Sequence, residues 1–212
     1  MSSPENVQIL CPGCKRTITV TVFRSIDDQW PDAAKKVISG ELFRFQCPHC
    51  GRKDRLKYDI AFHDAEHRAW IQVVNDPAQI PDYIAALNLS SEHLGLRRRI
   101  VHSIHELREK AMAFYLGRDD RILEIYKHIA KAQFMLQSPD FVLTREPFYA
   151  GSVETGDEVI TFYGKAGASE IVPLDDRYYQ FLHTKFAGQI QAETGRYVYD
   201  SAWAEEFARG IT

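Results

Sequence analysis

The first 75 residues alternate between polar and apolar positions, a pattern typical of β-strands. β-Branched and aromatic residues are frequent in these stretches. Pro31 precedes and Gly40 follows a short apolar stretch, and this placement favours a helix inserted between strands. We therefore expect a small antiparallel sheet with one inserted helix. The expected strands are residues 17–24, 42–45, 57–62 and 68–74.

A helical period follows this segment. From residue 97 to residue 138 apolar residues recur every three or four positions, on both sides of Gly117. Asp119 and Asp120 suit the start of the second helix. Because the connection is short, we predict an antiparallel helical hairpin. Residues 76–96 are predicted to be a linker. The apolar face expected for the second helix contains Ile122, Ile125, Tyr126, Ile129 and Leu136.

Residues 139–212 are predicted to form a small α/β segment. Helices are expected to begin near Asp175 and Ser201. The run Gly164-Lys165-Ala166-Gly167 lacks the residue order of a phosphate-binding loop, so a hairpin turn is expected there. The fold class is therefore α+β. The expected strands of this segment are residues 141–143, 158–163 and 170–172.

Composition narrows the class of protein. The chain has 212 residues, of which 45% are hydrophobic and 26% are charged, as in ordinary globular proteins, so disorder as the main state is excluded. No apolar run approaches the ~20 residues of a membrane-spanning helix. The N-terminal sequence has no apolar stretch behind a basic start, as a secretory signal would have. We therefore expect a cytoplasmic protein that has no membrane partner.

The four cysteines carry the clearest chemical signal. They form two C-x-x-C pairs, Cys11 with Cys14 and Cys47 with Cys50, and 32 residues separate the pairs. Matched pairs of this kind suit one tetrahedral Zn²⁺ ion. A redox-active pair and two structural disulfides are weaker interpretations, the second because the cytosol keeps thiols reduced. Four thiolates leave no open coordination position, so the predicted zinc ion is structural, with one per chain.

Basic residues follow both cysteine pairs. Lys15 and Arg16 follow the first pair, and Arg52 and Lys53 follow the second. Two interpretations remain open: these cations offset the charge of the thiolates, or they contact phosphate. Residues 1–75 contain 11 Lys and Arg against 9 Asp and Glu, and the whole chain has a net charge of −3. The charge balance favours the first interpretation. Since Lys15 stands where the second pair has Gly51, a less regular first turn is expected.

Other polar groups are weaker candidates. His63, Asp64 and His67 could hold a second metal, but the flanking alternation favours an ordinary hairpin turn. His102 and His105 are expected on a solvated helix face. The run Arg97-Arg98-Arg99 is expected to open the first long helix, where cations oppose the helix dipole. A bound anion or an acidic partner surface would explain that placement.

The cysteine pairs Cys11-Pro12-Gly13-Cys14 and Cys47-Pro48-His49-Cys50 resemble those of the CpXC proteins, a prokaryotic family. The resemblance extends over about residues 8–136 and implies the four cysteines as zinc ligands, but no activity. No catalytic residue is predicted. We expect a non-enzymatic zinc-ribbon protein that binds another protein. Nucleic-acid binding is the first alternative, and an enzyme with an unrecognised site in residues 95–212 is the second.

Overall fold

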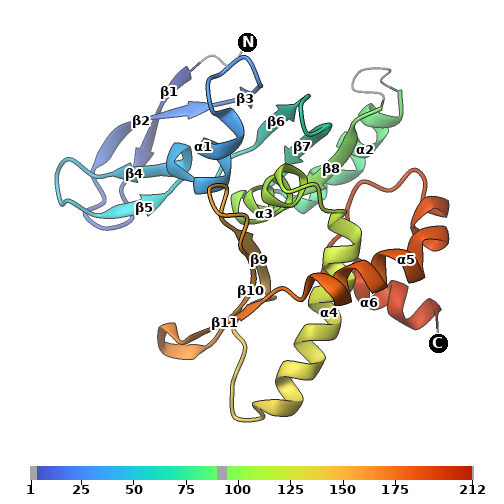
Figure 1. The fold of residues 1–212 in the computed structure, drawn as a ribbon. Coiled ribbons are helices and arrows are strands. Elements are labelled where there is room, and N and C mark those ends of the chain that lie inside the picture. The colour runs from blue at the N-terminus through green and yellow to red at the C-terminus, as the bar shows by residue number, and fades with distance from the viewer. Residues whose placement is uncertain (1–3, 90–94, 212) are drawn as a thin grey trace. The chain divides into compact units, whose positions relative to one another are not determined.

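The computed structural model describes residues 4–89 and 95–211. The remaining residues of the predicted zinc module, of the linker 76–96 and of the C-terminal segment lie outside this description. The chain divides into two compact units, Met1–Ala111 and Met112–Thr212 (Figure 1). Both units combine helices with sheets, which confirms the predicted α+β class.

Two antiparallel hairpins form the start of the first unit. One consists of β1 (Pro4–Leu10) and β2 (Thr17–Phe23), and the other of β4 (Arg44–Gln46) and β5 (Lys53–Arg55). Strand β2 alternates strictly, so its threonines face out and its branched apolar residues face in. Together the hairpins have a small core of their own. Its buried members are Cys11, Ile18, Val20, Val22, Cys47 and Leu56.

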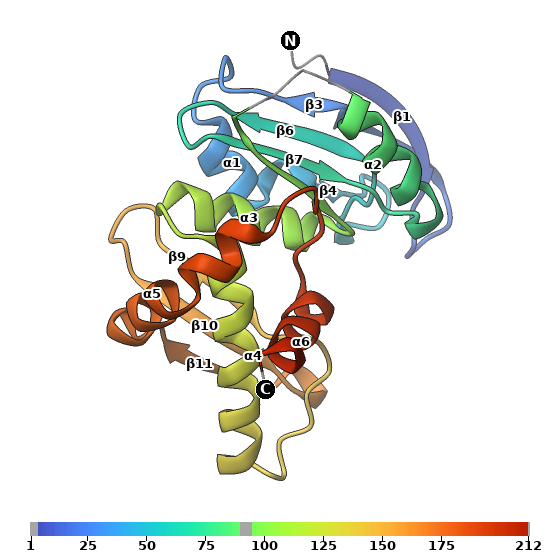
Figure 2. The ribbon, with the colours of Figure 1, turned by 90° about the vertical axis from the view of Figure 1, so that its right-hand side faces the viewer.

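A four-stranded mixed sheet completes the first unit. Its strands are β3 (Ser25–Ile26), β6 (Ile60–Asp64), β7 (Ala69–Val73) and β8 (Arg97–Val101), in the order β3-β6-β7-β8. Strands β6 and β7 are antiparallel, whereas β3 runs parallel to β6 and β8 parallel to β7 (Figure 2). The inserted helix is confirmed as α1 (Ala33–Ser39), followed by η1 (Glu41–Phe43). The predicted linker contains η2 (Pro77–Gln79) and α2 (Ile80–Leu89).

The helix that we predicted to begin at Arg97 begins later, which corrects the prediction. Residues 97–101 form β8, and α3 runs over Ile104–Tyr115. The main chain of β8 pairs with β7, and Ile100 and Val101 are buried. A capping box starts α3, because the Ser103 hydroxyl accepts the Glu106 N–H while the Glu106 carboxylate accepts the His102 N–H. The Ser-x-x-Glu pattern that signals this start was present in the sequence.

The junction after α3 follows the prediction closely. Gly117 has φ 71.8° rounded to 72°, and its N–H bonds Phe114 while the Arg118 N–H bonds Ala113, as in a Schellman ending. Asp119 then caps α4 (Asp120–Gln137) by accepting the Arg121 N–H. Helix α4 packs against α5 (Asp176–Ala192) and α6 (Ser201–Gly210). The hairpin arrangement of α3 with α4 stays a prediction.

The second unit also contains an antiparallel sheet of the order β11-β10-β9. Its strands are β9 (Phe148–Gly151), β10 (Glu158–Tyr163) and β11 (Ser169–Pro173), and η3 (Lys165–Gly167) forms the predicted turn between the last two. The strand predicted at 141–143 is wrong, since only Leu143 makes an isolated bridge. Leu136, predicted on the buried face of α4, is 83% exposed. No helix in the described residues is long and apolar enough to cross a membrane.

Candidate metal centre

The two cysteine pairs lie in the turns of the two hairpins of the first unit. In the first turn the Cys11 N–H donates to the Arg16 carbonyl at 2.9 Å, and the Lys15 N–H donates to the Cys11 carbonyl at 2.9 Å. The second turn repeats the pattern with Cys47 and Arg52 at 2.8 Å and with Gly51 and Cys47 at 2.9 Å. Each hairpin therefore presents its two cysteines on the same tight backbone turn.

The first turn is as regular as the second, contrary to our expectation. Lys15 has φ 59° and Gly51 has φ 71°, so both residues adopt the left-handed conformation that follows the second cysteine. A side chain in this conformation costs roughly 1–2 kcal/mol. The hydrogen bonds of the turn and the contacts around it hold Lys15 in place despite this cost.

The four sulfurs meet at one point between the hairpins. The Cys11 and Cys50 Sγ atoms are 3.7 Å apart, as are the Cys14 and Cys47 Sγ atoms, and all four lie within 4.8 Å of one another. A tetrahedral ion with metal–sulfur bonds of about 2.3 Å requires sulfur–sulfur distances of about 3.8 Å. The sulfur positions therefore fit a four-coordinate metal ion.

Backbone groups around the sulfurs affect the pKa values of the thiols. The Cys14 N–H donates to the Cys11 sulfur, and with a smaller contribution from Gly13 it lowers the pKa of Cys11 to about 6. The Arg52 N–H likewise favours the thiolate of Cys50, but desolvation and the three neighbouring sulfurs outweigh it and raise the pKa of Cys50 to about 11. One thiol therefore ionises readily at the expense of another, and a divalent cation relieves the repulsion among four thiolates.

The site is closed in its chemistry. Cys11 and Cys47 are buried, Cys14 is half-buried, and only Cys50 is exposed. Four cysteine ligands complete a tetrahedron, so no position remains for a substrate or a reactive water. An ion held here would join the two hairpins and stabilise their shared core.

One of the four basic residues near the cysteines is already paired. The Arg52 guanidinium donates to the Asp54 carboxylate at 2.9 Å and 3.0 Å, and its Cδ lies where a side chain at Gly13 would stand. Lys15, Arg16 and Lys53 are exposed. Arg52 therefore spans the two turns, which weakens the interpretation of these four cations as one phosphate-binding group.

The weaker candidates occupy structural positions. His63, Asp64 and His67 lie in and beside the β6–β7 turn, where the Asp64 carboxylate contacts the His67 ring at 2.7 Å and accepts the His67 N–H at 3.1 Å. Among residues 4–89 and 95–211, the cysteine cluster is the one group of His, Cys, Asp and Glu side chains with metal-binding spacing.

The three consecutive arginines lie on β8. The Arg97 guanidinium donates to the His67 carbonyl at 2.6 Å, and that of Arg98 donates to the Leu87 carbonyl at 2.9 Å. Arg99 is 7% exposed. Because these residues do not stand at a helix N-terminus, the argument from the helix dipole no longer supports an anion or partner surface at Arg97, Arg98 and Arg99.

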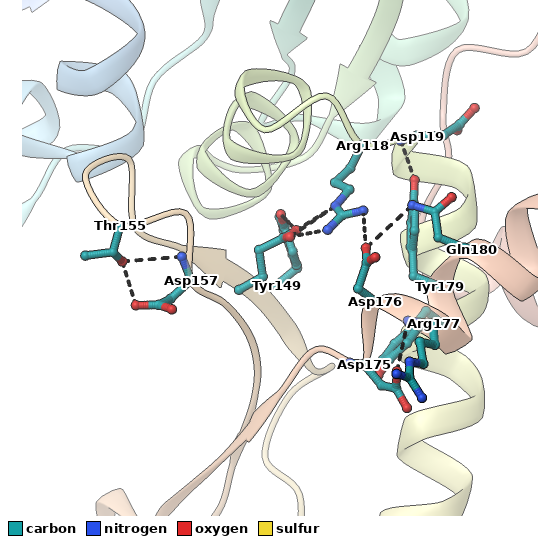
Figure 3. Close-up of polar contacts among 12 residues, drawn as sticks. Arg118, Asp119, Tyr149, Thr155, Asp157, Asp175, Asp176, Arg177, Tyr179 and Gln180 are labelled. Atoms are coloured by element: carbon teal, nitrogen blue, oxygen red, sulfur yellow. Dashed lines mark hydrogen bonds and ion pairs between the residues drawn. The ribbon is translucent and has the colours of Figure 1, made fainter.

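A polar cluster in the second unit was not predicted. Arg118 makes a bidentate contact with Glu158 and an ion pair of 2.7 Å with Asp176, and its guanidinium lies 4.6 Å from the centre of the Tyr179 ring. The buried Tyr149 hydroxyl also donates to Glu158. Figure 3 shows these side chains converging from β9, the α3–α4 junction and α5. Because its members bind one another, the cluster is structural. No local sequence signal connects residues so far apart in the chain.

Comparison with known proteins gives one match. A family model described as CpXC protein matches residues 9–127, which include all four cysteines and more than half of the chain. No curated protein matches this chain. No solved structure matches it either.

Proposed function

The chain belongs to the CpXC family, and from this premise we propose that it is a zinc protein whose metal is structural and whose task is to bind another protein. The convergence of four cysteine sulfurs at tetrahedral distances is the single observation that carries the proposal. Among common metals, Zn²⁺ combines a tetrahedral preference with an affinity for thiolates. In the cytoplasm, where we place the protein, thiols stay reduced and available for coordination.

A non-enzymatic role follows from the ligand set. When bound, the ion would be held by Cys11, Cys14, Cys47 and Cys50, and it would supply cross-linking of the two hairpins. The protein itself orients the sulfurs through backbone N–H groups and excludes solvent from two of them. A catalytic zinc site would instead keep one position open for water.

Binding to protein is favoured over binding to nucleic acid by the distribution of charge. The first 75 residues have a small excess of basic residues, and the whole chain is acidic. Arg52, which stands beside the cysteines, is already paired with Asp54. A nucleic-acid binder that makes 6–10 phosphate contacts needs many more free cations on one face.

Elemental analysis of the purified chain tests the metal assignment. We expect about one equivalent of zinc per chain, following from the single four-cysteine site. Replacement by Co²⁺ should give the visible absorption of a tetrahedral tetrathiolate complex. The Cys47→Ser variant serves as the control and should lose both signals. Two disulfides and no metal in protein purified under reducing conditions would refute the proposal.

A further inference from the structure

The hairpin that carries the second cysteine pair has one strongly basic face. In the register of β4 with β5, Arg44 lies opposite Arg55 and Gln46 lies opposite Lys53. Residues two apart along a strand share a face, so these four side chains lie on the same face. All four are exposed. Three of the four carry a positive charge, and two of those charges are directly opposed.

Backbone hydrogen bonds bring the two arginines especially close. The Leu56 N–H donates to the Phe43 carbonyl at 2.7 Å, and the Cys47 N–H donates to the Arg52 carbonyl at 2.8 Å. Hydrogen-bonded and non-hydrogen-bonded pairs alternate along an antiparallel ladder, so Arg44 and Arg55 form a non-hydrogen-bonded pair. Cβ atoms in such pairs lie about 4.5–5.5 Å apart, and like charges placed there destabilise the hairpin.

The hairpin itself does not neutralise these charges. Asp54 lies between Lys53 and Arg55 in sequence, but its side chain belongs to the opposite face and pairs with Arg52. Arg44 donates to the Ser39 carbonyl at 3.3 Å, which leaves its charge uncompensated. Within the part of the chain that the structure describes, no carboxylate forms an ion pair with Arg44, Lys53 or Arg55.

We propose that this basic face, formed by Arg44, Gln46, Lys53 and Arg55, binds an extended acidic segment of a partner protein. The proposal rests on the proposed function, because a metal at Cys47 and Cys50 would fix the hairpin that spaces these charges. The residues of the hairpin line an open hollow of ≈ 520 Å³. In an extended peptide, alternate side chains lie on one side at about 6.6–6.8 Å, the spacing of Lys53 and Arg55 along β5.

The number of charges distinguishes an acidic peptide from a nucleic acid. Three cations on a short hairpin match two or three alternate carboxylates. They fall well below the 6–10 phosphate contacts of a typical duplex DNA binder. The planar arginine groups also suit bidentate hydrogen bonding to carboxylates.

A direct binding assay tests the proposal. The probe is a fluorescent eight-residue peptide in which glutamate alternates with threonine, titrated with the zinc-loaded full chain at about 50 and 150 mM salt. We expect binding that weakens as salt rises, because exposed charges are screened. The double variant Arg44→Gln/Arg55→Gln should lose at least about tenfold in affinity while its thermal stability stays equal or rises, since a repulsive pair is removed.

The matched control removes two charges from the other hairpin. Lys15→Gln/Arg16→Gln changes the net charge equally and should bind the peptide as the unmodified chain does. Equal loss in both variants would reveal nonspecific attraction and overturn the proposal. Tighter binding of a single-stranded oligothymidylate than of the peptide would overturn it in favour of nucleic acid. Absence of peptide binding by a chain with one equivalent of zinc would refute this inference alone, whereas absence of zinc would refute the proposed function as well.

Discussion

Removal of the metal should unfold the two hairpins that carry the cysteines and leave the four-stranded sheet folded. The perturbation is treatment of the zinc-loaded chain with a strong chelator, or the substitution Cys47→Ser. We expect β1, β2, β4 and β5 to lose their structure together, because the cysteines lie at the centre of the core that these strands share. Strands β6, β7 and β8 have a separate set of buried residues and should persist.

The expected size of the effect follows from the composition of that core. Apart from the cysteines its fully buried members are Ile18, Val20, Val22 and Leu56. Burial of one such side chain contributes about 1.5–3 kcal/mol, so the four together contribute roughly 6–12 kcal/mol. Structural zinc contributes about 10–16 kcal/mol of apparent binding energy in zinc-finger peptides. The metal therefore stabilises the hairpins at least as much as their apolar residues do, and isolated hairpins are marginal in water.

Hydrogen exchange read by mass spectrometry measures the result strand by strand. Amides of Cys11 and Cys47, which donate within the two turns, should exchange rapidly after chelation. Amides of β7, which pair on both sides, should stay protected. The Cys47→Ser chain supplies the control, since chelator should cause no further change in it. Continued protection of the hairpins without metal, or simultaneous loss of protection in β7, would refute the reasoning.

Three further predictions concern single residues. Glu158→Gln should lower the free energy of unfolding of the second unit by about 2–4 kcal/mol because it leaves the half-buried Arg118 poorly compensated, whereas Asp176→Asn, at an exposed partner, should cost under about 1 kcal/mol; equal costs in denaturant titrations would contradict this. Lys15→Gly should raise the melting temperature of the zinc-loaded chain by relieving about 1 kcal/mol of left-handed strain, and a fall would show that the lysine side chain is needed. Gly117→Ala should destabilise by about 1–2 kcal/mol for the same backbone reason, with no steric clash to add, so an unchanged melting temperature would argue against the Schellman ending.

The metal site could be predicted from the sequence because its signal is local. Each cysteine pair occupies four consecutive residues, and the turn that orients the pair is closed by backbone groups of the same few residues. The alternation of β2 was equally informative, since a strand with one buried face repeats every two residues. What the sequence left open was the meeting of the two pairs, which depends on both hairpins.

The errors fall where a short segment is shaped by distant partners. Arg97 to Val101 resemble the start of a helix in sequence, yet pairing with β7 holds them in a strand. The capping box of Ser103 and Glu106 was the better signal for the start of α3. The four residues of β9 are too few to show a period, and only pairing with β10 identifies them as a strand.

The polar cluster around Arg118 lay beyond sequence reasoning for a related reason. Its members come from positions 118, 149, 158, 176 and 179, and each is common as an ordinary surface residue. Their shared location results from the packing of the second unit, in which the ends of β9, β10 and α5 meet the start of α4. A buried charge network of this kind has no spacing rule along the chain.

The long interval between the two cysteine turns has a consequence for how the chain can vary. A metal held by both pairs would close a loop of about the 32 intervening residues, which contains β3 and α1. The entropy of closing a loop rises only with the logarithm of its length, so each doubling costs about 0.6 kcal/mol. Extra residues inserted at the exposed turn of residues 27–31 would therefore weaken the metal-bound state very little. Insertions inside either cysteine turn would instead break the hydrogen bonds that orient the sulfurs.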